Sequence, residues 1–411
     1  MKRSGGTFVC PLTAPGQGGI SVIFLCGPDA EHILSRIFYP VAQTRFSRRK
    51  NNQFFYGHIT EGGEVIDEVI LFPLSKSVSP FGESAFEINC HGGVAVTDAI
   101  IDTLCRSGAR RIDFSEALRK LANSGQISAV KFEARMELTR ATSPLAVRML
   151  LSQLRGALEK EVERICSLLI ESADGARRGI SRLLRGAQLG IFLCEPPSVS
   201  ISGSPNVGKS TLFNKLCGCE RVIVHETPGT TRDVITETIL VDGMAVRLSD
   251  SAGIGAVSSE LEKLAERFAR KALKTADFIL FVLDSSRRLN SFEKHFLPAL
   301  DREKSILIMN KTDLPKALKK SELPDSMRIV QTSALKETGI EEVKAAMMSK
   351  IAGKKLPAFD RAMIFTRRQK RILEAVLQNL ENGKIDSAGR VLAEFTHGKV
   401  YDGQGTASYS G

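Results

Sequence analysis

A chain of 411 residues with 43% hydrophobic and 25% charged residues is too long for one ordinary domain and too apolar for a disordered protein. We therefore expect two or three folded domains. The net charge of +11 fits contact with a polyanion such as RNA, and it fits a general basic bias equally well. No apolar run reaches the length of a membrane span and no secretory signal is evident. These patterns predict a cytoplasmic protein without membrane contact, whose eight scattered cysteines stay reduced.

Residues 1–115 predict a mixed α+β domain. Strands are expected within 18–27 and 64–74, and a helix within 92–109. Residues 116–196 predict helices. Apolar side chains recur there at steps of three and four, which predicts one apolar stripe along a single long helix. The stripe consists of Val147, Leu151, Leu154, Leu158, Val162, Ile165 and Leu169.

Strand-like and helix-like segments alternate over residues 197–355, and this alternation predicts a doubly wound α/β sheet. Residues 356–411 begin with another helical pattern and end in a Gly- and Ser-rich stretch. Helical segments on both sides of the α/β unit indicate that it is inserted into a helical domain.

A complete P-loop, Gly203-x-x-x-x-Gly208-Lys209-Ser210, opens the α/β unit. The glycines let backbone N–H groups approach phosphates, Lys209 can reach the β and γ oxygens, and the Ser210 hydroxyl can ligate Mg²⁺. Further along, "GTTRD" (229–233) offers a threonine to the same Mg²⁺. The motif "DSAG" (250–253) follows an apolar strand, with its aspartate near the metal and Gly253 near the γ-phosphate.

Two later motifs predict which nucleotide base the site binds. In "NKTD" (310–313), Asp313 can accept hydrogen bonds from N1–H and the exocyclic amine of guanine, which adenine does not offer. The segment "SAL" (333–335) can donate backbone N–H groups to the guanine O6. The site is therefore expected to prefer GTP. Ile254 stands where many GTPases carry a water-orienting glutamine, and no arginine finger is evident, so another group must supply charge and position the water.

The chain resembles the tRNA-modification GTPases of the MnmE (TrmE) family along nearly its entire length. The resemblance is carried by "APGQGGISVI", "YGHITEGGEVIDEVILFPL", "EINCHGG", "SPNVGKSTLFNKL" and "TPGTTRD". It implies an N-terminal folate-binding and dimerisation domain, a helical domain and an inserted G domain. It also implies a homodimer that joins the flavoprotein MnmG in a heterotetramer. That pair adds a carboxymethylaminomethyl group to the wobble uridine, U34, of certain tRNAs.

The resemblance also implies cations and roles at the nucleotide site. K⁺ would replace an arginine finger, with Asn206, Thr227 and Thr230 as ligands and His225 where a threonine is common. Ser210 and Thr231 would hold Mg²⁺. The catalytic candidates are Lys209, Thr231 and Glu262, the last orienting water. The expected GTP-binding set is Asn206, Val207, Gly208, Lys209, Ser210, Thr211, His225, Glu226, Thr227, Pro228, Gly229, Thr230, Thr231, Asp250, Ser251, Ala252, Gly253, Asn310, Lys311, Asp313, Ser333, Ala334 and Leu335.

The implied site for 5-formyltetrahydrofolate falls on Phe24, Glu87 and Gln126. The family has an arginine and a lysine at the first and third of these positions, so two polar contacts are missing. The family's C-terminal Cys-x-Gly-Lys is also not found, since no cysteine follows Cys219. His91, in "CHGG", is interpreted as structural.

Two alternatives remain open on the sequence. One is a GTP-dependent switch or dimerising scaffold that no longer modifies tRNA. The other is a ribosome-assembly GTPase of the Era and Der type, which predicts a KH-like RNA-binding region. No GXXG loop in a suitable context follows the α/β unit.

Overall fold

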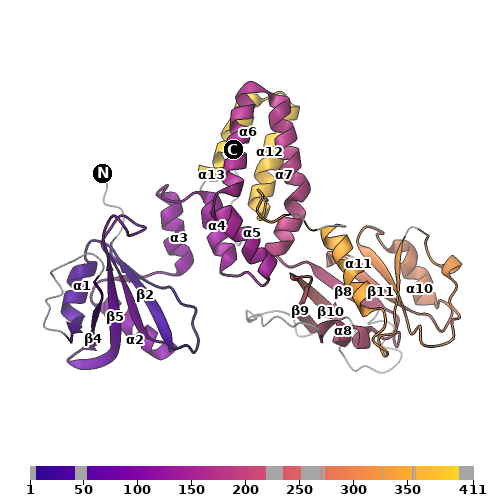
Figure 1. Cartoon of the computed structure of the whole chain (residues 1–411), viewed down its shortest axis with the longest axis horizontal. Helices are drawn as coiled ribbons and strands as arrows, with labels where there is room; N and C mark the ends of the chain where they lie inside the picture. Colours follow the sequence, from indigo (N-terminus) through magenta and orange to yellow (C-terminus); the bar gives the residue numbers. More distant parts are fainter. Residues whose placement is uncertain are drawn as a thin grey trace. The chain divides into compact units, whose positions relative to one another are not determined.

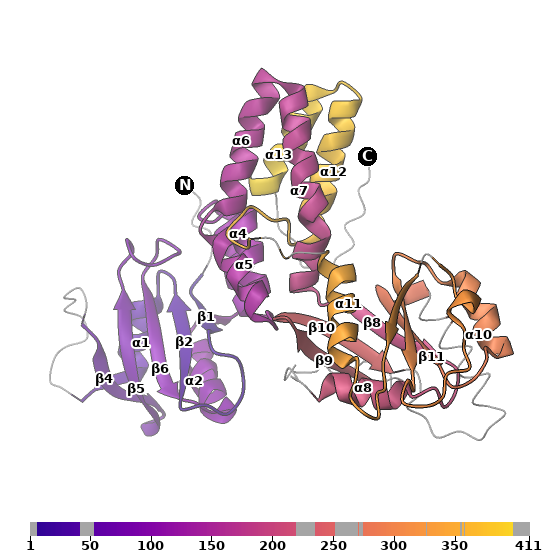
Figure 2. The same cartoon turned by 45° about the vertical axis from the view of Figure 1, so that its right-hand side comes forward.

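The computed structural model describes residues 6–41, 53–218, 235–250, 270, 274–325, 327–353, 356 and 358–397. They form two compact units, one made mostly by the chain up to Phe132 and the other by Glu133–Phe395. Figures 1 and 2 show both units from two directions. No described helix is long and apolar enough to cross a membrane.

The first unit is built on a seven-stranded sheet in the order β3-β4-β5-β6-β2-β1-β7. Neighbouring strands are antiparallel except β1 and β7, which are parallel. The predicted strands at 18–27 and 64–74 are present as β2 and β5. The strands are β1 (Phe8–Pro11), β2 (Ile20–Cys26), β3 (Phe38–Pro40), β4 (Phe55–Glu61), β5 (Glu64–Leu74), β6 (Ala85–His91) and β7 (Arg110–Arg111).

Successive side chains of β2 point to opposite faces of the sheet, so this strand contributes to a separate part of the core on each face. Ile23 and Leu25 pack with the helices α1 (Ala30–Ile37) and α2 (Val94–Arg106). Phe24 and Cys26 point to the opposite face, where they join a smaller cluster that includes Ala117 of α3 (Phe114–Asn123). The helix expected within 92–109 is therefore confirmed as α2.

The second unit contains a group of helices in which α7 packs against both α6 and α12. Both views show α6 and α7 (magenta) beside α12 (yellow), although the two segments are far apart in sequence (Figures 1 and 2). The helices are α4 (Ala129–Leu138), which begins in the first unit, α5 (Pro144–Leu154), α6 (Ala157–Glu171), α7 (Ala173–Cys194), α12 (Arg367–Glu381) and α13 (Ile385–His397).

The prediction of one long helix through residues 147–169 is wrong. The chain breaks at Gly156, whose φ of +93° is a left-handed conformation that favours glycine. Because of the break, the predicted apolar stripe does not continue along one helix face. It is buried as predicted only on α6, at Leu158, Val162, Ile165 and Leu169. On α5 the buried positions are instead Ala146, Met149, Leu150 and Gln153, and Leu151 is 39% exposed.

Two buried polar side chains join the chain before the α/β unit to the chain after it. Gln153 donates to the carbonyl of Arg361 at 3.0 Å and accepts from the N–H of Met363 at 3.3 Å. Glu133 accepts hydrogen bonds from two of the guanidinium nitrogens of Arg368, at 2.6 and 3.0 Å, and from the side-chain amide of Gln369 at 2.8 Å. Such fully partnered buried groups fix the returning chain against α4 and α5.

The α/β part of the second unit has a six-stranded sheet in the order β13-β12-β11-β8-β10-β9. All neighbours are parallel except β9 and β10. The predicted alternation of strands and helices is present, while β9 and α10 were not predicted. The elements are β8 (Ser198–Gly203), α8 (Lys209–Cys217), β9 (Ile235–Val241), β10 (Met244–Asp250), β11 (Phe278–Asp284), α10 (Ser291–Phe296), η1 (Leu297–Ala299), β12 (Ser305–Asn310), η2 (Lys320–Glu322), β13 (Arg328–Gln331) and α11 (Ile340–Ala352).

Helices lie on both faces of this sheet. Ile279, Phe281 and Leu283 of β11 pack with Phe296 and Leu297 on the α10 side. On the other face α8 contacts β8 and β10, and α11 contacts β12, β13 and α8. Ligands of such sheets bind at the carboxyl ends of the strands, and the P-loop, "NKTD" and Asp284 all lie at those ends.

Candidate functional site

The P-loop connects the end of β8 to the start of α8. Asn206 has φ of +62° and Gly208 has φ of +95°, so the backbone turns through left-handed conformations as it approaches the helix. A Cβ on Gly208 would lie 2.2 Å from the side-chain nitrogen of Asn310. Position 208 therefore requires glycine for both its backbone angle and the close approach of Asn310.

Lys209 is 6% exposed and its ammonium is held inside the loop. The Nζ atom donates to the carbonyl of Gly203 at 3.0 Å and to that of Ser204 at 2.7 Å. Burial lowers the pKa of Lys209 to about 8, and the carboxylate of Asp250 partly offsets this decrease. The lysine is thus a cation in a poorly hydrated loop, where its attraction to phosphate oxygens is strong.

The structure also bears on the expected Mg²⁺ ligands. Ser210 is exposed at the beginning of α8, next to Lys209. Asp250 ends β10, is 2% exposed, and lies close enough to Lys209 to act on its pKa. A hydroxyl and a carboxylate are oxygen ligands of the kind that Mg²⁺ takes, so the described part of this site fits the ion.

The guanine-reading loop follows β12. Asn310 is buried, and its amide nitrogen donates to the carbonyl of Val207 at 2.8 Å. Lys311 has φ of +61° and its ammonium lies 2.6 Å from the carboxylate of Asp284. Asp313 accepts a hydrogen bond from the Ser333 hydroxyl, and this bond is the main reason that the pKa of Asp313 is lowered. Asp313 is therefore held ionised, so both of its oxygens can accept hydrogen bonds.

The segment 333–335 lies beside this loop. The N–H of Ser333 donates to the carbonyl of Thr338 at 3.0 Å, and that of Ala334 donates to the side-chain oxygen of Asn310 at 2.9 Å. Among the described residues the N–H of Leu335 has no acceptor. Of the three predicted O6 donors, Leu335 is thus the one whose hydrogen is not already used within the described protein.

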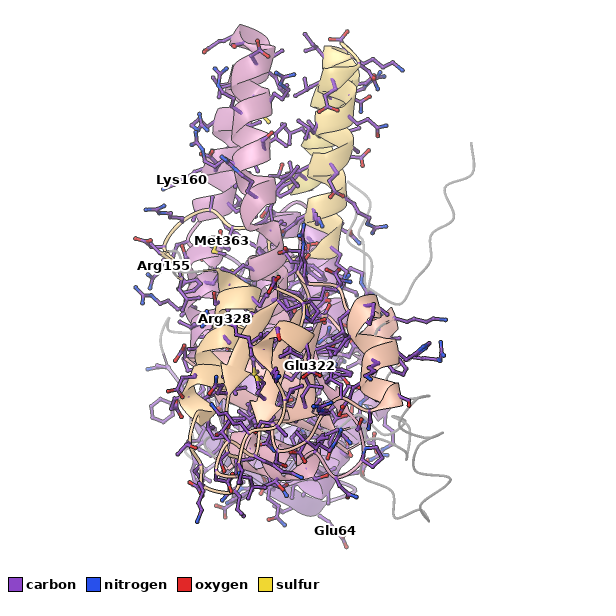
Figure 3. All side chains as sticks on the ribbon, turned by 90° about the vertical axis from the view of Figure 1, so that its right-hand side faces the viewer. Glu64, Arg155, Lys160, Glu322, Arg328 and Met363 are labelled. Carbon is purple, nitrogen blue, oxygen red and sulfur yellow. The ribbon has the colours of Figure 1, made fainter. Side chains whose placement is uncertain are left out.

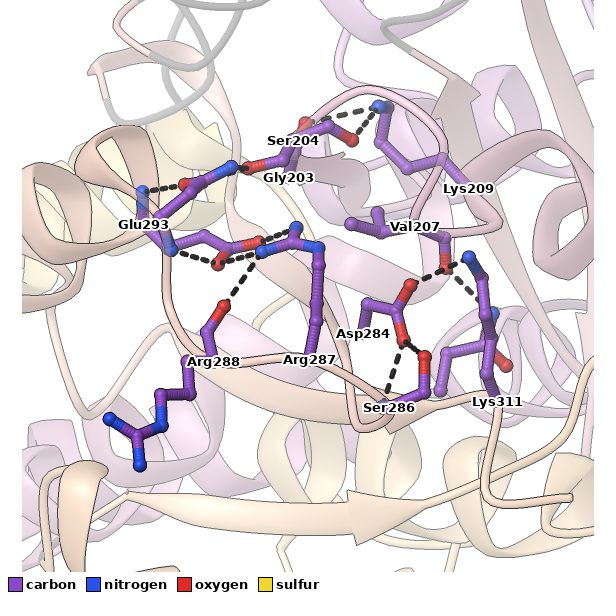
Figure 4. A network of polar contacts seen from close by, with 12 residues as sticks. Gly203, Ser204, Val207, Lys209, Asp284, Ser286, Arg287, Arg288, Glu293 and Lys311 are labelled. Carbon is purple, nitrogen blue, oxygen red and sulfur yellow. Dashed lines mark hydrogen bonds and ion pairs between the residues drawn. The ribbon is translucent and has the colours of Figure 1, made fainter. Parts of the chain in front are cut away.

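A second polar network, which the sequence reasoning missed, braces the P-loop from the α10 side (Figure 4). Ser204 exchanges hydrogen bonds with the side chain of Asn290 at 3.0 and 3.3 Å. Asn290 also caps α10 in a reciprocal pair with Glu293, which is 1% exposed and held by two nitrogens of Arg287. The signal was available, because Asn290 followed three residues later by Glu293 is a capping-box pattern.

Asp284, at the end of β11, belongs to the same region (Figure 4). Burial alone would raise its pKa, but hydrogen bonds from Lys311 and Ser286 outweigh this effect and lower it. The pair with Lys311 therefore stays ionised and fixes the loop that contains "NKTD".

Part of the predicted site lies outside the described residues. It includes Glu262, three of the K⁺ candidates (His225, Thr227 and Thr230) and the Mg²⁺ candidate Thr231. It also includes the GTP-binding candidates Glu226, Pro228, Gly229, Ser251, Ala252 and Gly253, and Ile254.

Two of the implied folate positions, Phe24 and Glu87, lie on the same face of the N-terminal sheet, and the third, Gln126, follows α3. Phe24 and Glu87 are direct cross-strand partners on β2 and β6, and the side-chain nitrogen of Gln126 lies 3.9 Å from where a Cβ on Gly82 would be. Phe24 is 5% exposed and its ring lies 6.3 Å from that of Phe8 and 5.8 Å from that of Phe81.

These residues do not fit an anionic folate. Lys120 lies 4.8 Å over the ring of Phe8, so the nearby cation is used against an aromatic face. An aromatic cluster occupies the place where the family has an arginine, and it offers no partner for a carboxylate. We therefore assign no step to folate in this chain.

His91 is held by Asp67, which accepts from its backbone N–H at 2.8 Å and contacts its ring Nδ1 at 2.6 Å. The hydrogen bond and charge of Asp67 raise the pKa of His91. These contacts give the side chain a structural role at the end of β6.

Known proteins were compared with this chain. A family model for the GTP-binding protein TrmE N-terminus matches residues 7–120, and one for the 50S ribosome-binding GTPase matches residues 198–311. The tRNA modification GTPase MnmE of Thermoanaerobacter sp. (strain X514) is 33% identical over 369 residues, which cover 82% of this chain and 80% of that protein. The MnmE of Listeria welshimeri serovar 6b is 32% identical over 404 residues, covering 91% and 88%.

The chain belongs to the family of tRNA modification GTPases MnmE. The match to the TrmE N-terminus and the coverage of MnmE relatives decide against a ribosome-assembly GTPase, despite the description of the second family model. The G domain of the T. maritima FeoB iron transporter aligns with 38% of this chain at 27% identity and a TM-score of 0.28.

Proposed function

We propose that this chain hydrolyses GTP in the modification of wobble uridine in tRNA. The observation that carries the proposal is the bond from Asn310 to Val207, which joins a guanine-reading loop to a P-loop in a chain that also has a TrmE-type N-terminal domain. The first loop selects the base and the second binds the phosphates, and one buried amide holds them in register.

The roles of the site residues follow from their chemistry. Lys209 neutralises the β and γ oxygens, and Asp313 accepts from the guanine edge. Ser210 and Thr231 would hold Mg²⁺, and this ion would supply positive charge beside the phosphate oxygens. Position 254 is isoleucine instead of glutamine, and the sequence singles out no arginine finger. The chain is therefore proposed to use K⁺ held by Asn206, His225, Thr227 and Thr230, with Glu262 orienting water.

The proposal includes the assembly that the family implies. The chain would act as a homodimer with an MnmG-type flavoprotein and tRNA in the cytoplasm. Turnover of GTP should be compared in KCl and NaCl at equal ionic strength. Faster turnover in KCl is expected, and Asn206→Ala should reduce the difference between the salts. Equal rates in both salts would remove K⁺ from the mechanism while leaving the GTPase itself in place.

A second candidate function is a GTP-dependent switch or dimerising scaffold without modification chemistry. The aromatic cluster around Phe24 favours it, because the family's folate contacts are replaced there. Wobble nucleosides should be measured in cells that lack this protein, with and without a restored copy. Restored modification supports the modifying enzyme. Unchanged nucleosides from a copy that still hydrolyses GTP would support the scaffold.

A further inference from the structure

The helix α7 presents a strip of arginines on its outer face. Arg178, Arg182 and Arg185 are exposed and recur at steps of four and three, so they share one side of the helix. Together with Arg177 and Ser181 they line a shallow open hollow along α7. The opposite side of the helix is apolar and buried, with Ile180, Leu183 and Ala187 among its residues. The strip is therefore held on a rigid helix that is fixed by packing. We call Arg178, Arg182 and Arg185 the arginine strip.

The arginine strip is not balanced by carboxylates of the described protein. None of its three guanidinium groups forms an ion pair or hydrogen bond with a described residue. Arg182 lies near Glu161, whose pKa it helps to lower, but the Glu161 oxygens are taken by Arg164 at 2.6 and 2.9 Å.

Some other cations in the same group of helices are paired with carboxylates. Arg367 lies 2.8 Å from Glu195, and Arg368 lies 2.6 Å from Glu133. Arg177 pairs with Asp174 at 3.4 Å, so it is partly neutralised at the edge of the strip. Figure 3 shows how densely polar side chains cover these helices, with Arg155 and Lys160 directed outward near the start of α6. In the arginine strip, three guanidinium groups share one side of a single helix, and such a concentration of positive charge attracts a polyanion.

We propose that the arginine strip docks the phosphate backbone of the RNA substrate. This inference rests on the proposed function, which supplies a tRNA. Guanidinium groups bind phosphates through two parallel N–H bonds. Arg178 and Arg185 are about 10 Å apart along the helix at 1.5 Å per residue, enough to span about three phosphates at roughly 3.4 Å of axis each.

A protein partner is less well matched to this face. Hot spots of protein interfaces combine arginines with buried tryptophan and tyrosine anchors, and α7 exposes no large apolar side chain on this side that could act as such an anchor. The exposed Ile170 belongs to the end of α6. Backbone docking carries no sequence information, so the arginine strip would set affinity and position while other parts of the assembly choose the base.

The test compares the triple variant Arg178→Gln, Arg182→Gln, Arg185→Gln with a control that removes the same charge, Lys304→Gln, Lys319→Gln, Lys320→Gln. The control lysines are exposed on the α/β part. The probe is an unmodified transcript of a tRNA with uridine at the wobble position, titrated with and without the flavoprotein partner at 50 and 200 mM salt. GTP turnover without RNA checks that each variant is folded.

Each phosphate contact contributes about 0.7 to 0.9 to the slope of log affinity against log salt. The arginine variant should therefore lose about 2 to 3 from that slope, and bind about 30-fold more weakly at 50 mM salt but within about 2-fold of the wild type at 200 mM. The control should bind within about 3-fold of the wild type, since scattered surface charges act weakly through salt. Basal GTP turnover should be unchanged in both variants.

Three outcomes would overturn the inference. If the wild type binds the transcript and the arginine variant binds equally well, the arginine strip has no role while the proposed function stands. If the variant keeps RNA binding but no longer assembles with the flavoprotein, the face is a protein interface. If the wild type binds no tRNA, alone or with its partner, the proposed function fails first and this inference fails with it.

Discussion

The buried amide of Asn310 donates a hydrogen bond to the backbone carbonyl of Val207 at 2.8 Å, across 103 residues of the chain. The oxygen of the same amide accepts from the N–H of Ala334 at 2.9 Å. One side chain thus connects the phosphate loop, the guanine-reading loop and the segment after β13. Neither the identity of Asn310 nor its neighbours in the sequence shows this connection.

Replacing Asn310 with alanine should weaken nucleotide binding more than a surface substitution would. The change leaves the Val207 carbonyl and the Ala334 N–H without partners in a buried place, at about 1–3 kcal/mol each. We expect affinity for a fluorescent GDP analogue to fall about 10- to 100-fold, with a lower unfolding temperature. Lys316→Ala, which removes an exposed bond to Gln331, is the control. Wild-type affinity in Asn310→Ala would show that the connection does not position the nucleotide.

Asp313→Asn should exchange the base preference of the site. The asparagine oxygen can still accept from N1–H, but its amino group faces the exocyclic amine of guanine, whereas xanthine offers a carbonyl there. Sites built for one hydrogen-bond pattern reject the other strongly, so GTP should bind about 100-fold or more weakly and XTP more tightly. Competition with the fluorescent GDP analogue measures both. Ser333→Ala should cost less, because the carboxylate remains. Unchanged GTP affinity in Asp313→Asn would place the base elsewhere.

The extent of prediction from sequence differs between local and long-range features. β5 and α2 were predicted well because apolar residues recur in them at the period of a strand or a helix. The helix break at Gly156 was missed, since a glycine within a helical pattern costs only about 1 kcal/mol and the apolar spacing continues across it. The correct phase of α5 depends on Gln153 and its partners more than 200 residues later.

At the nucleotide site, the motifs predicted which residues lie together but not the hydrogen bonds that hold the loops in place. The P-loop and "NKTD" are recognisable because their spacing is fixed by phosphate and base. The bracing of Ser204 by Asn290 spans 86 residues and has no such spacing. Phe24 shows the opposite limit, because the sequence reveals the loss of a charged residue but not that Phe8 and Phe81 pack against its replacement.

Nucleotide binding should take up a proton at Lys209 in mildly alkaline solution. Burial lowers the pKa of Lys209 to about 8, and bound phosphates must raise it because they favour the charged form. Affinity is then steady below about pH 8 and weakens by up to about 10-fold per pH unit above it. Calorimetry at pH 8.5 in two buffers of different ionisation enthalpy measures the uptake. Lys209→Arg, which cannot lose its proton in this range, should show none. Equal enthalpies for the wild type in both buffers would contradict the prediction.

Glu137→Gln should change how stability depends on pH. Burial raises the pKa of Glu137 from 4.5 to about 7; Arg140 opposes this increase, and the carboxylates Glu195 and Glu133 add to it. Between about pH 4.5 and 7 the folded state therefore binds more protons than the unfolded state, and stability falls as pH rises through this window.

The glutamine of the variant stays neutral at every pH. The variant should therefore be more stable than the wild type by about 1–3 kcal/mol above pH 7, and the two proteins should have nearly equal stability at pH 5. Urea unfolding at both pH values tests this, with the exposed Glu394→Gln as control. An equal difference at pH 5 and pH 8 would contradict it.

The aromatic cluster at Phe24 predicts that 5-formyltetrahydrofolate does not bind this chain at concentrations up to about 100 μM. A dissociation constant of that size requires about 5.5 kcal/mol of total binding free energy, which a site without a partner for the ligand's charge does not supply. Phe24→Ala should cost about 3–5 kcal/mol of stability, because it removes a buried ring from contact with Phe8 and Phe81. The substitution should not create folate binding, since no cation is gained.

Isothermal titration of both proteins with the folate measures ligand recognition. Unfolding of Phe24→Ala is compared with that of Phe72→Ala, whose ring is 40% exposed, as the control for packing. Saturable binding to the wild type would mean that the cluster rearranges around a ligand, and the case for a scaffold without modification chemistry would lose its structural support.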